Sequence, residues 1–543
     1  MFAAYVRTVW IIQAVTQCYG GSSVGGFFGN MNSLLFLVVL LTAATASRKL
    51  FLAATLVRTF TRISSMPYIW EVELWAVLMD LTLLAVRCEP RRAADAIRGQ
   101  MIVFYAGAAF WKLNTSFLDA STSCGTIFFA QLIAAFAPSF ADSAAIATLL
   151  RIAAPVAAVA VELAVPLLLT VWSRGGLALA LVFHLLVVLT PPPNNAGGFS
   201  VCAAQYLFFF APAAVASLLA ELRNSPTAFF TVLGWSGAAL AIGSHVGRHQ
   251  FFFDTAPCAY GVQLVLLVAA VLRHGDADSE AQYSPNQHKS TSARPLRRTL
   301  PVGASAVYAF VLPTLGLMDQ MAPNMFSNQR FHGGSNHLFA PTGLVHALLP
   351  TSTIALIRIH STTSTHMRAQ YPAEVTASFT PAARKLLHAV GHTGRQWNPM
   401  LGRVVGVMAI AGPTPDDARA KPPVQYSIPA LELRRLIAEA RAKNESFELE
   451  YAHLEGGRGT EHWRATSAVK TIVYRYDAAA SRASCHALYQ SAATGRRPSR
   501  GRCADDEIAM LPPPPWWALW LIAFQPLPIL AGEAWAEVHC YGP

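Results

Sequence analysis

A succession of long apolar segments dominates the first part of this chain and limits what it can fold into. Many of them approach the roughly 20 residues that a helix needs to cross a bilayer. They are residues 31–47, 50–60, 70–86, 101–118, 125–140, 144–172, 177–190, 199–220, 228–245, 257–272 and 301–318. Because the shorter runs also suit buried helices, we expect about nine to eleven membrane segments.

The composition agrees with a membrane protein. Hydrophobic residues make up 53% of the 543 residues and charged residues 13%, against about 25% in soluble domains. We therefore predict an all-α polytopic membrane helix bundle followed by a C-terminal α+β extramembrane region. We expect an integral, multi-pass membrane protein whose partner is the lipid bilayer. The net charge of +11 does not indicate nucleic acid, because arginines near helix ends fit the positive-inside bias.

The predicted boundary between the two parts is residue 318. Residues 1–318 form the transmembrane domain, with a polar linker at 273–300 before the last span. Residues 319–543 are mostly extramembrane in composition. Within them, residues 430–443 have helical spacing, and residues 446–454 and 470–477 alternate like paired strands.

The end of the chain has two further features. The proline-rich apolar tail Pro512–Gly532 is predicted to pack on the membrane domain or lie at the interface, and a true last span is the alternative. One pair among Cys485, Cys503 and Cys540 would form a disulfide if this region faces an oxidising compartment.

Ionisable residues inside the apolar segments are the first candidates for function. They are Asp80, Lys112, Arg151, Glu162 and His184. A charge in hydrocarbon is costly, so such residues face a bundle interior, a cavity or a partner. They form either one polar site or a set of independent salt bridges. Removal of a lysine from water disfavours its charged form, which would let Lys112 act as a base. The alternatives are a lysine that reaches the headgroups and, for His184, a hydrogen-bonded core residue.

A second polar cluster lies in the turn from Met325 to Pro341. Its candidate cavity residues are Asn328, Arg330, Asn336 and His337, just beyond the last predicted span. His388 and His392 have the spacing of metal ligands, but no carboxylate accompanies them at a familiar distance, so no metal is predicted.

Several short stretches, in order, resemble the HTTM (horizontally transferred transmembrane) domain family, which is related to vitamin K-dependent gamma-carboxylase. They are Phe104-Tyr105-Ala106-Gly107 through Trp111-Lys112-Leu113-Asn114, then Ser123-Cys124, Val161-Glu162-Leu163 before Pro166, Phe183-His184-Leu185 before Phe199-Ser200, and Met325–Asn328 with Gly333–His337. The resemblance covers about residues 30–345.

This resemblance implies that Lys112 is a general base acting on reduced vitamin K or a related quinol. By position, Phe199-Ser200 and His184 would line the same cavity, and Asn114 is a further cavity candidate. A peptide or small molecule would be the second substrate, modified in a carboxylation-like step. The chain departs from the carboxylase by having Trp111-Lys112 where that enzyme has a lysine pair. Its residues 345–543 do not match the enzyme's substrate-recognition region. The alternative is a non-catalytic carrier or partner-binding scaffold, although residues 31–318 show no inverted repeats of the transporter kind.

Overall fold

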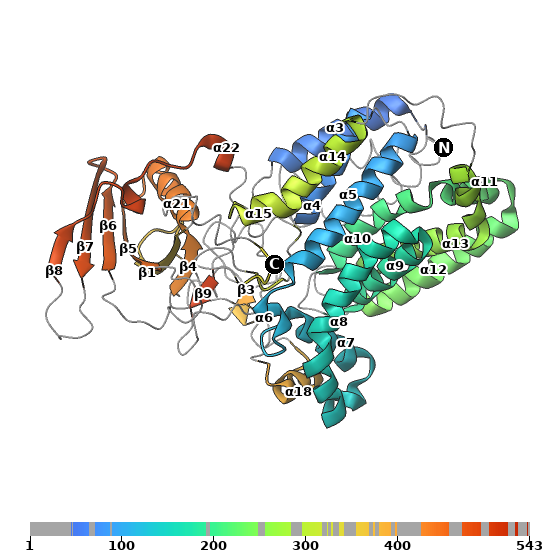
Figure 1. The fold of residues 1–543 in the computed structure, drawn as a ribbon, viewed down its shortest axis with the longest axis horizontal. Coiled ribbons are helices and arrows are strands. Elements are labelled where there is room, and N and C mark those ends of the chain that lie inside the picture. Colours follow the sequence, from blue (N-terminus) through green and yellow to red (C-terminus); the bar gives the residue numbers. More distant parts are fainter. Residues whose placement is uncertain are drawn as a thin grey trace.

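The computed structural model has a helical part and a sheet part, which lie side by side (Figure 1). It describes residues 45, 47–64, 71–86, 90–191, 196–247, 256–283, 296–317, 323, 327–329, 336–340, 355–368, 373–374, 379–392, 397–398, 425–454, 470–489, 499–519, 527–529 and 540.

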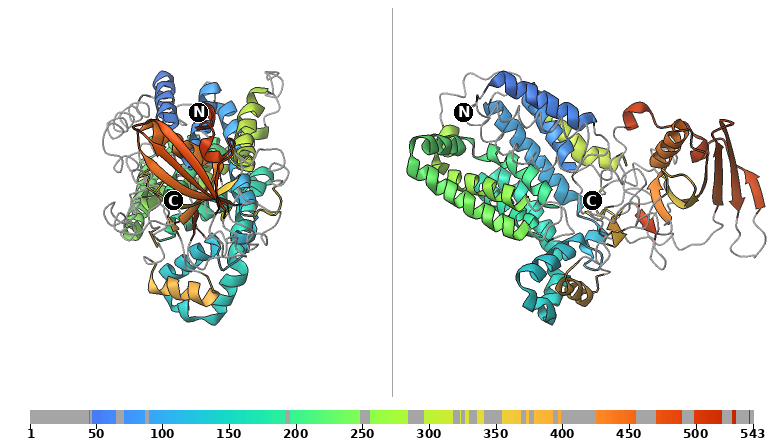
Figure 2. Two further views of the ribbon diagram at one scale, coloured as in Figure 1. Left: turned by 90° about the vertical axis from the view of Figure 1, so that its left-hand side faces the viewer. Right: turned by 180° about the vertical axis from the view of Figure 1, so that it is seen from behind.

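Helices make up the helical part, and most of them run beside one another in the right-hand view of Figure 2. They are α3 (Arg48–Ser64), α4 (Glu71–Ala85), α5 (Pro90–Trp111), α7 (Cys124–Phe136), α8 (Ala144–Val171), α9 (Ser173–Leu189), α10 (Ala196–Leu207), α11 (Pro212–Asn224), α12 (Pro226–Gly247), α13 (Ala256–Tyr283) and α14 (Leu296–Ala306). Shorter pieces are α6 (Thr115–Leu118), η1 (Pro138–Asp142), η2 (Phe208–Phe210), the π-helical turn η4 (Val307–Val311) and α15 (Leu312–Thr314). Trp75 packs against Phe104 and Tyr308 in their shared core.

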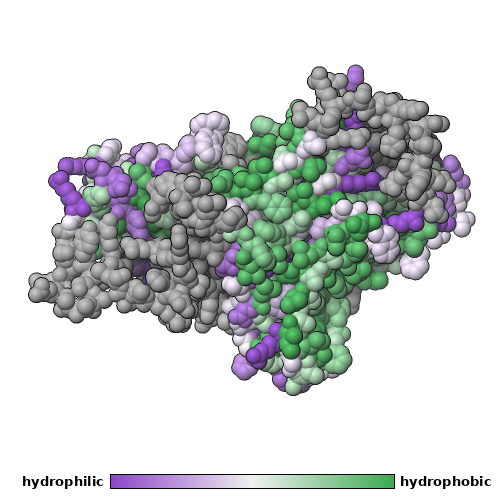
Figure 3. All heavy atoms as spheres, in the orientation of Figure 1, coloured by the Kyte–Doolittle hydropathy of each residue, from purple (hydrophilic) through white to green (hydrophobic). Residues whose placement is uncertain are grey.

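Three described helices are long and apolar enough to cross a membrane. They are Ala144–Val171, Pro226–Gly243 and Pro257–Gly275, and a pair bent by 93°, Phe199–Phe210 with Pro212–Asn224, would make a fourth. On α8, Leu149, Ile152 and Val156 are each more than half exposed. Apolar surface covers much of the helical part on the face drawn in Figure 3. These features support association with a membrane, and the larger number of spans stays a prediction.

Several predicted helix boundaries differ from those in the structure. The lysine-bearing helix begins at Pro90 and ends at Trp111, whereas the predicted segment ran from residue 101 to residue 118. Proline suits the first position of a helix, where its missing N–H is not needed. The predicted segment 199–220 is bent before Pro212. The predicted linker 273–300 is helical up to Tyr283 and from Leu296, and its middle lies outside the described residues.

The sheet part is a seven-stranded antiparallel sheet in the order β8-β7-β6-β5-β1-β4-β9. Its strands are β1 (Leu356–Thr362), β4 (Gln425–Pro429), β5 (Phe447–Leu454), β6 (Lys470–Asp477), β7 (Arg482–Tyr489), β8 (Ser499–Arg502) and β9 (Leu527–Ile529). A two-stranded sheet joins β2 (Ala373–Glu374) and β3 (Trp397–Asn398). The predicted strand pair is confirmed, with Phe447 opposite Tyr476.

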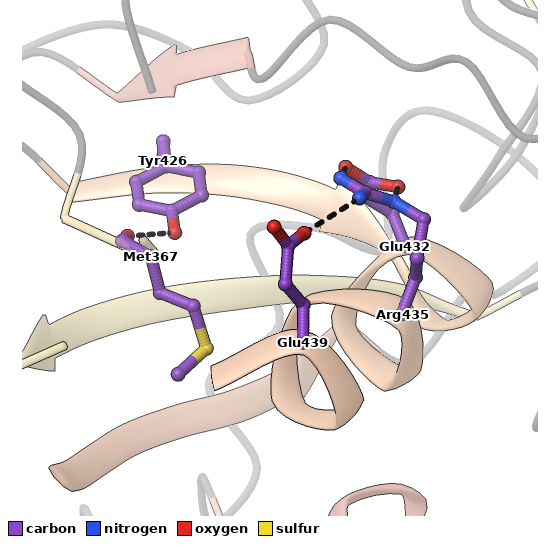
Figure 4. A network of polar contacts seen from close by, with 5 residues as sticks. All are labelled: Met367, Tyr426, Glu432, Arg435 and Glu439. Carbon is purple, nitrogen blue, oxygen red and sulfur yellow. Dashed lines mark hydrogen bonds and ion pairs between the residues drawn. The ribbon is translucent and has the colours of Figure 1, made fainter. Parts of the chain in front are cut away.

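Helix α21 (Ala430–Ala442) confirms the predicted helix and packs on the sheet through Leu433 and Leu436. Arg435 is buried on this helix and pairs with Glu432 at 2.6 Å and Glu439 at 3.2 Å (Figure 4). These two ion pairs compensate the charge of Arg435, which would be costly to bury alone. Beside it, the hydroxyl of Tyr426 donates to the backbone carbonyl of Met367.

The proline-rich tail contributes to both parts. Its strand β9 pairs with β4 at the sheet edge, which the sequence analysis did not predict. A 3-10 turn, η7 (Ile508–Met510), lies just before the tail, and the tail itself contains a short helix, α22 (Trp516–Leu519). Ala518 of α22 packs with Leu431 and with Leu317, which follows the last helix of the helical part. Residues 520–526 and 530–532 of the tail lie outside the described residues.

Helix α18 (Pro381–Val390) leaves the sheet part and packs on α7 and α8, with Phe379 and Leu386 in the shared core. A disulfide between Cys124 and Cys540 lies in the same cluster. Residues after 318 therefore complete the helical part as well as form the sheet.

A second disulfide joins Cys485 on β7 to Cys503, as the sequence analysis allowed. It closes a loop across a sequence separation of 18, which in the chain-entropy model stabilises the folded state by about 3 kcal/mol. We expect Cys485→Ser to lower the free energy of unfolding of the sheet part by a similar amount. Limited proteolysis at increasing denaturant concentrations measures this change. Cys202, which belongs to neither disulfide, supplies the control, Cys202→Ser. Equal resistance of the two variants would contradict the prediction.

Candidate active site

Lys112 follows the last residue of α5 and is 7% exposed. Trp111 before it is fixed in place, because its indole Nε1 donates to the carbonyl of Ala309 at 2.7 Å. The Nζ of Lys112 lies 2.8 Å from Oε2 of Glu162 on α8. It also lies 3.4 Å from the carbonyl of Ala108, so the ammonium group folds back one turn along α5. The two predicted residues therefore form a nearly buried ion pair.

The pair lies in the wall of a cavity of about 140 Å³ between helices α5, α7, α8, α9 and α10. The lining residues are Phe104, Tyr105, Ala108, Lys112, Phe117, Gly125, Phe128, Phe129, Leu132, Ala157, Ala158, Val161, Glu162, Phe183, Leu186, Val187, Thr190, Phe199 and Pro323. Most of this wall is aromatic or aliphatic. Leu186 lines the cavity and is also 43% exposed, so the cavity reaches the apolar outer surface.

A buried hydrogen-bonded chain lies behind one side of the cavity. The hydroxyl of Tyr105 lies 2.6 Å from Nε2 of His184, and Nδ1 of His184 lies 3.0 Å from Oγ of Ser200. His184 and Ser200 are wholly buried and do not line the cavity themselves, whereas Tyr105 does. The predicted residues His184 and Ser200 therefore reach the cavity through Tyr105.

Three asparagines join the segment after Lys112 to the second polar cluster. Asn114 donates through Nδ2 to the carbonyl of Ser327 at 2.6 Å. Asn328 donates to the carbonyl of Thr122 at 2.9 Å and accepts from the N–H of Cys124 at 3.1 Å. Buried amides whose donors and acceptors are satisfied fix the geometry of the chains they join. The two segments therefore form a single rigid unit beside the ion pair.

Asn336 and His337 complete this unit. The Nδ2 of Asn336 donates to the carbonyl of Asn328 at 2.8 Å and to Oγ of Ser116 at 3.0 Å. His337 forms a β-bridge with Asn114 and donates from Nε2 to the carbonyl of Phe110 at 2.8 Å. Burial lowers the pKa of His337 and outweighs that hydrogen bond, which raises it. The imidazole is therefore held neutral, with Nδ1 accepting backbone N–H groups.

The remaining candidates lie elsewhere. Asp80 is wholly buried on α4 but does not line the cavity. Arg330 lies outside the described residues. His388 is exposed, while Nε2 of His392 contacts the carbonyl of Ser123 at 3.2 Å, so the two point apart. Within the described ranges, no group of three or more His, Cys, Asp or Glu side chains is arranged to hold a metal ion.

Comparison with known proteins gives one match. Residues 335–520 match a family model described as a domain of unknown function, DUF8388. The match begins beside Asn336 and covers most of the sheet part, and it does not extend to Lys112 or Glu162. No curated protein and no solved structure matches the chain significantly.

Most residues that line the cavity are uncharged and were not predicted, Tyr105 and Phe117 among them. In the sequence, Tyr105 stands out only within the stretch Phe104–Gly107 that resembles the HTTM family. Its spacing carried a signal, however, because Tyr105, Ala108 and Lys112 recur at three and four residues and so share one helix face. Phe117 lies on the short helix α6, where its ring centre is 5.9 Å from Nζ of Lys112.

The asparagine unit predicts a stability effect. Asn336→Ala leaves the buried carbonyl of Asn328 and the hydroxyl of Ser116 without this donor, which typically costs about 1–3 kcal/mol. We expect a lower thermal midpoint for the purified protein. Asn224→Ala, at an exposed site on α11, is the matched control and should leave the midpoint unchanged. A normal midpoint for Asn336→Ala would show that the two segments hold together without it.

Proposed function

We propose that this protein is a membrane-associated enzyme in which Lys112 removes a proton from the hydroxyl of a flat, apolar quinol. The observation that carries the proposal is the Lys112–Glu162 ion pair in the wall of a cavity lined mostly by aromatic and aliphatic groups. An ion pair in such surroundings costs free energy of desolvation, so it is weak evidence for a purely stabilising role.

The pair supports base catalysis with a balanced movement of protons. Transfer of one proton from the ammonium of Lys112 to the carboxylate of Glu162 across 2.8 Å gives a neutral amine and a neutral acid. The amine then accepts the proton of a bound hydroxyl, which leaves the ligand as an oxyanion beside the restored ammonium. General bases that act in this way typically contribute about 10²- to 10⁴-fold to a rate.

The cavity walls fit an aromatic ring. Phe117, Phe128 and Phe129 come from the side of α6 and α7, and Phe183 and Phe199 from α9 and α10. The volume of about 140 Å³ is close to that of an apolar cavity known to hold a benzene ring, roughly 150 Å³. A lipid tail on the ring would leave the cavity beside the exposed Leu186. When bound, a reduced quinone would supply the acidic hydroxyl and the electrons for reaction with oxygen.

The resemblance to the HTTM family supports the same residues, since Lys112 and Glu162 lie in the stretches that carry it. By that resemblance, the reaction at the quinol would drive modification of a second substrate, a peptide or a small molecule, in a carboxylation-like step.

The first test compares membranes that carry the wild type and Lys112→Ala at matched expression. Both receive a reduced naphthoquinone and oxygen, and epoxide formation is followed. We expect product from the wild type and a rate at least about 100-fold lower from Lys112→Ala, because the base is absent. Glu162→Gln should also be slow, since it cannot take up the proton.

Lys385→Ala is the matched control. Lys385 lies on α18 and pairs with Asp142 in an exposed ion pair, and neither residue lines the cavity, so loss of Lys385 should not change the rate. Equal rates for the wild type and Lys112→Ala would refute the assignment of the base. A folded wild type without any product would instead favour a non-catalytic carrier or scaffold.

A further inference from the structure

Tyr105 is a further polar residue that lines the cavity besides the ion pair. It lines the cavity from α5, and Lys112 lines it from the position just after the last residue of that helix, seven positions further along the chain. This corresponds to about 10 Å along the helix axis. The Nζ of Lys112 folds back one turn, to 3.4 Å from the carbonyl of Ala108, and the side chain of Tyr105 also leans toward the start of α5, so the two polar groups lie at separate points of an otherwise mostly apolar space. Such an arrangement suits a ring that carries an oxygen on each of two opposite edges.

Tyr105 is well suited to contact such a ligand. The residue is 1% exposed, and its hydroxyl is held at 2.6 Å from Nε2 of His184. A hydroxyl has one proton to donate and two lone pairs, so this bond leaves it able to make a further one. Its ring packs against Phe104 and His184, which restricts its orientation.

His184 and Ser200 determine the direction of that further bond. In one tautomer, Nδ1–H donates to Ser200 and Tyr105 donates to Nε2, so the Tyr105 oxygen can accept a proton from a ligand hydroxyl. In the other, Nε2–H donates to Tyr105 and Ser200 donates to Nδ1, so Tyr105 can donate to a ligand carbonyl. The number of protons is the same in both arrangements.

We infer that Tyr105 binds the ligand oxygen farther from Lys112, and that His184 and Ser200 are positioning residues that let it bind both the hydroxyl of a quinol and the carbonyl of a quinone. This rests on the proposed function, because it takes the same ligand class and adds a second contact. It explains why a histidine buried behind the cavity wall bridges two hydroxyl groups.

The test measures equilibrium binding of menadione and of its reduced form, under anaerobic conditions, to the full chain in detergent. Tyr105→Phe should raise the Kd of both probes about two- to tenfold, the range for the loss of one hydrogen bond. Tyr260→Phe is the matched control. Tyr260 is equally buried and donates to the carbonyl of Leu181 at 2.5 Å, but it does not line the cavity. Its Kd values should equal those of the wild type.

Ser200→Ala separates positioning from packing. Without Ser200, a proton on Nδ1 has no acceptor, and a buried N–H without a partner is especially disfavoured. The tautomer in which Nε2 carries the proton, and in which Tyr105 donates to the ligand, is then preferred. We therefore expect the reduced probe to lose more affinity than the oxidised one. Equal losses for the two probes would overturn the role of His184 and Ser200.

The remaining outcomes distinguish this inference from the proposed function. Wild-type affinity in Tyr105→Phe, together with a loss in Lys112→Ala, would overturn the inference alone. Equal weakening in Tyr105→Phe and Tyr260→Phe would also overturn it, because the effect would then be structural. A wild type that binds neither probe would overturn both the proposed quinol chemistry and this second contact.

Discussion

The ion pair between Lys112 and Glu162 is the interaction on which the site depends. Each side chain is 9% exposed, so neither charge is well solvated by water, and each requires the other. This requirement fixes the end of α5 against the middle of α8. Helices α7, α9 and α10 then close around the pair with apolar side chains. A cavity that is otherwise mostly apolar thus has a single charged edge, which in the proposed reaction would give a bound quinol one reactive orientation.

The polar segments next to the pair act as a support for it. Residues 114–124 and 327–337 are far apart in sequence, yet their asparagines exchange hydrogen bonds with each other's backbone. Asn328 adopts a positive φ of 53°, a conformation that asparagine tolerates better than most residues. These side chains do not line the cavity. Their contribution is to hold the end of α5, and therefore Lys112, in place.

Sequence reasoning identified the ion pair's residues because a charge within an apolar run is conspicuous. It also found α21 and the β5–β6 pair, whose periodicities of about 3.6 and 2 residues are clear. It did not distinguish the cavity from its support, because Glu162, Asn114 and His337 are all polar residues near apolar runs. Only the packing shows which of them face the cavity. Tyr105 was missed as a contact because a tyrosine in an apolar helix has no charge to mark it.

The disulfide between Cys124 and Cys540 has a consequence for how the sheet part can move. Cys124 begins α7, a helix that lines the cavity, and its partner lies 416 residues further along the chain. Between them the chain contacts the helical part twice more, first through α18 and then through Ala518, which packs with Leu317. The sheet is thus a long insertion anchored at several points, one of them covalent. The chain that follows the sheet therefore stays attached to α7 even where the noncovalent contacts open, until a reductant breaks the bond.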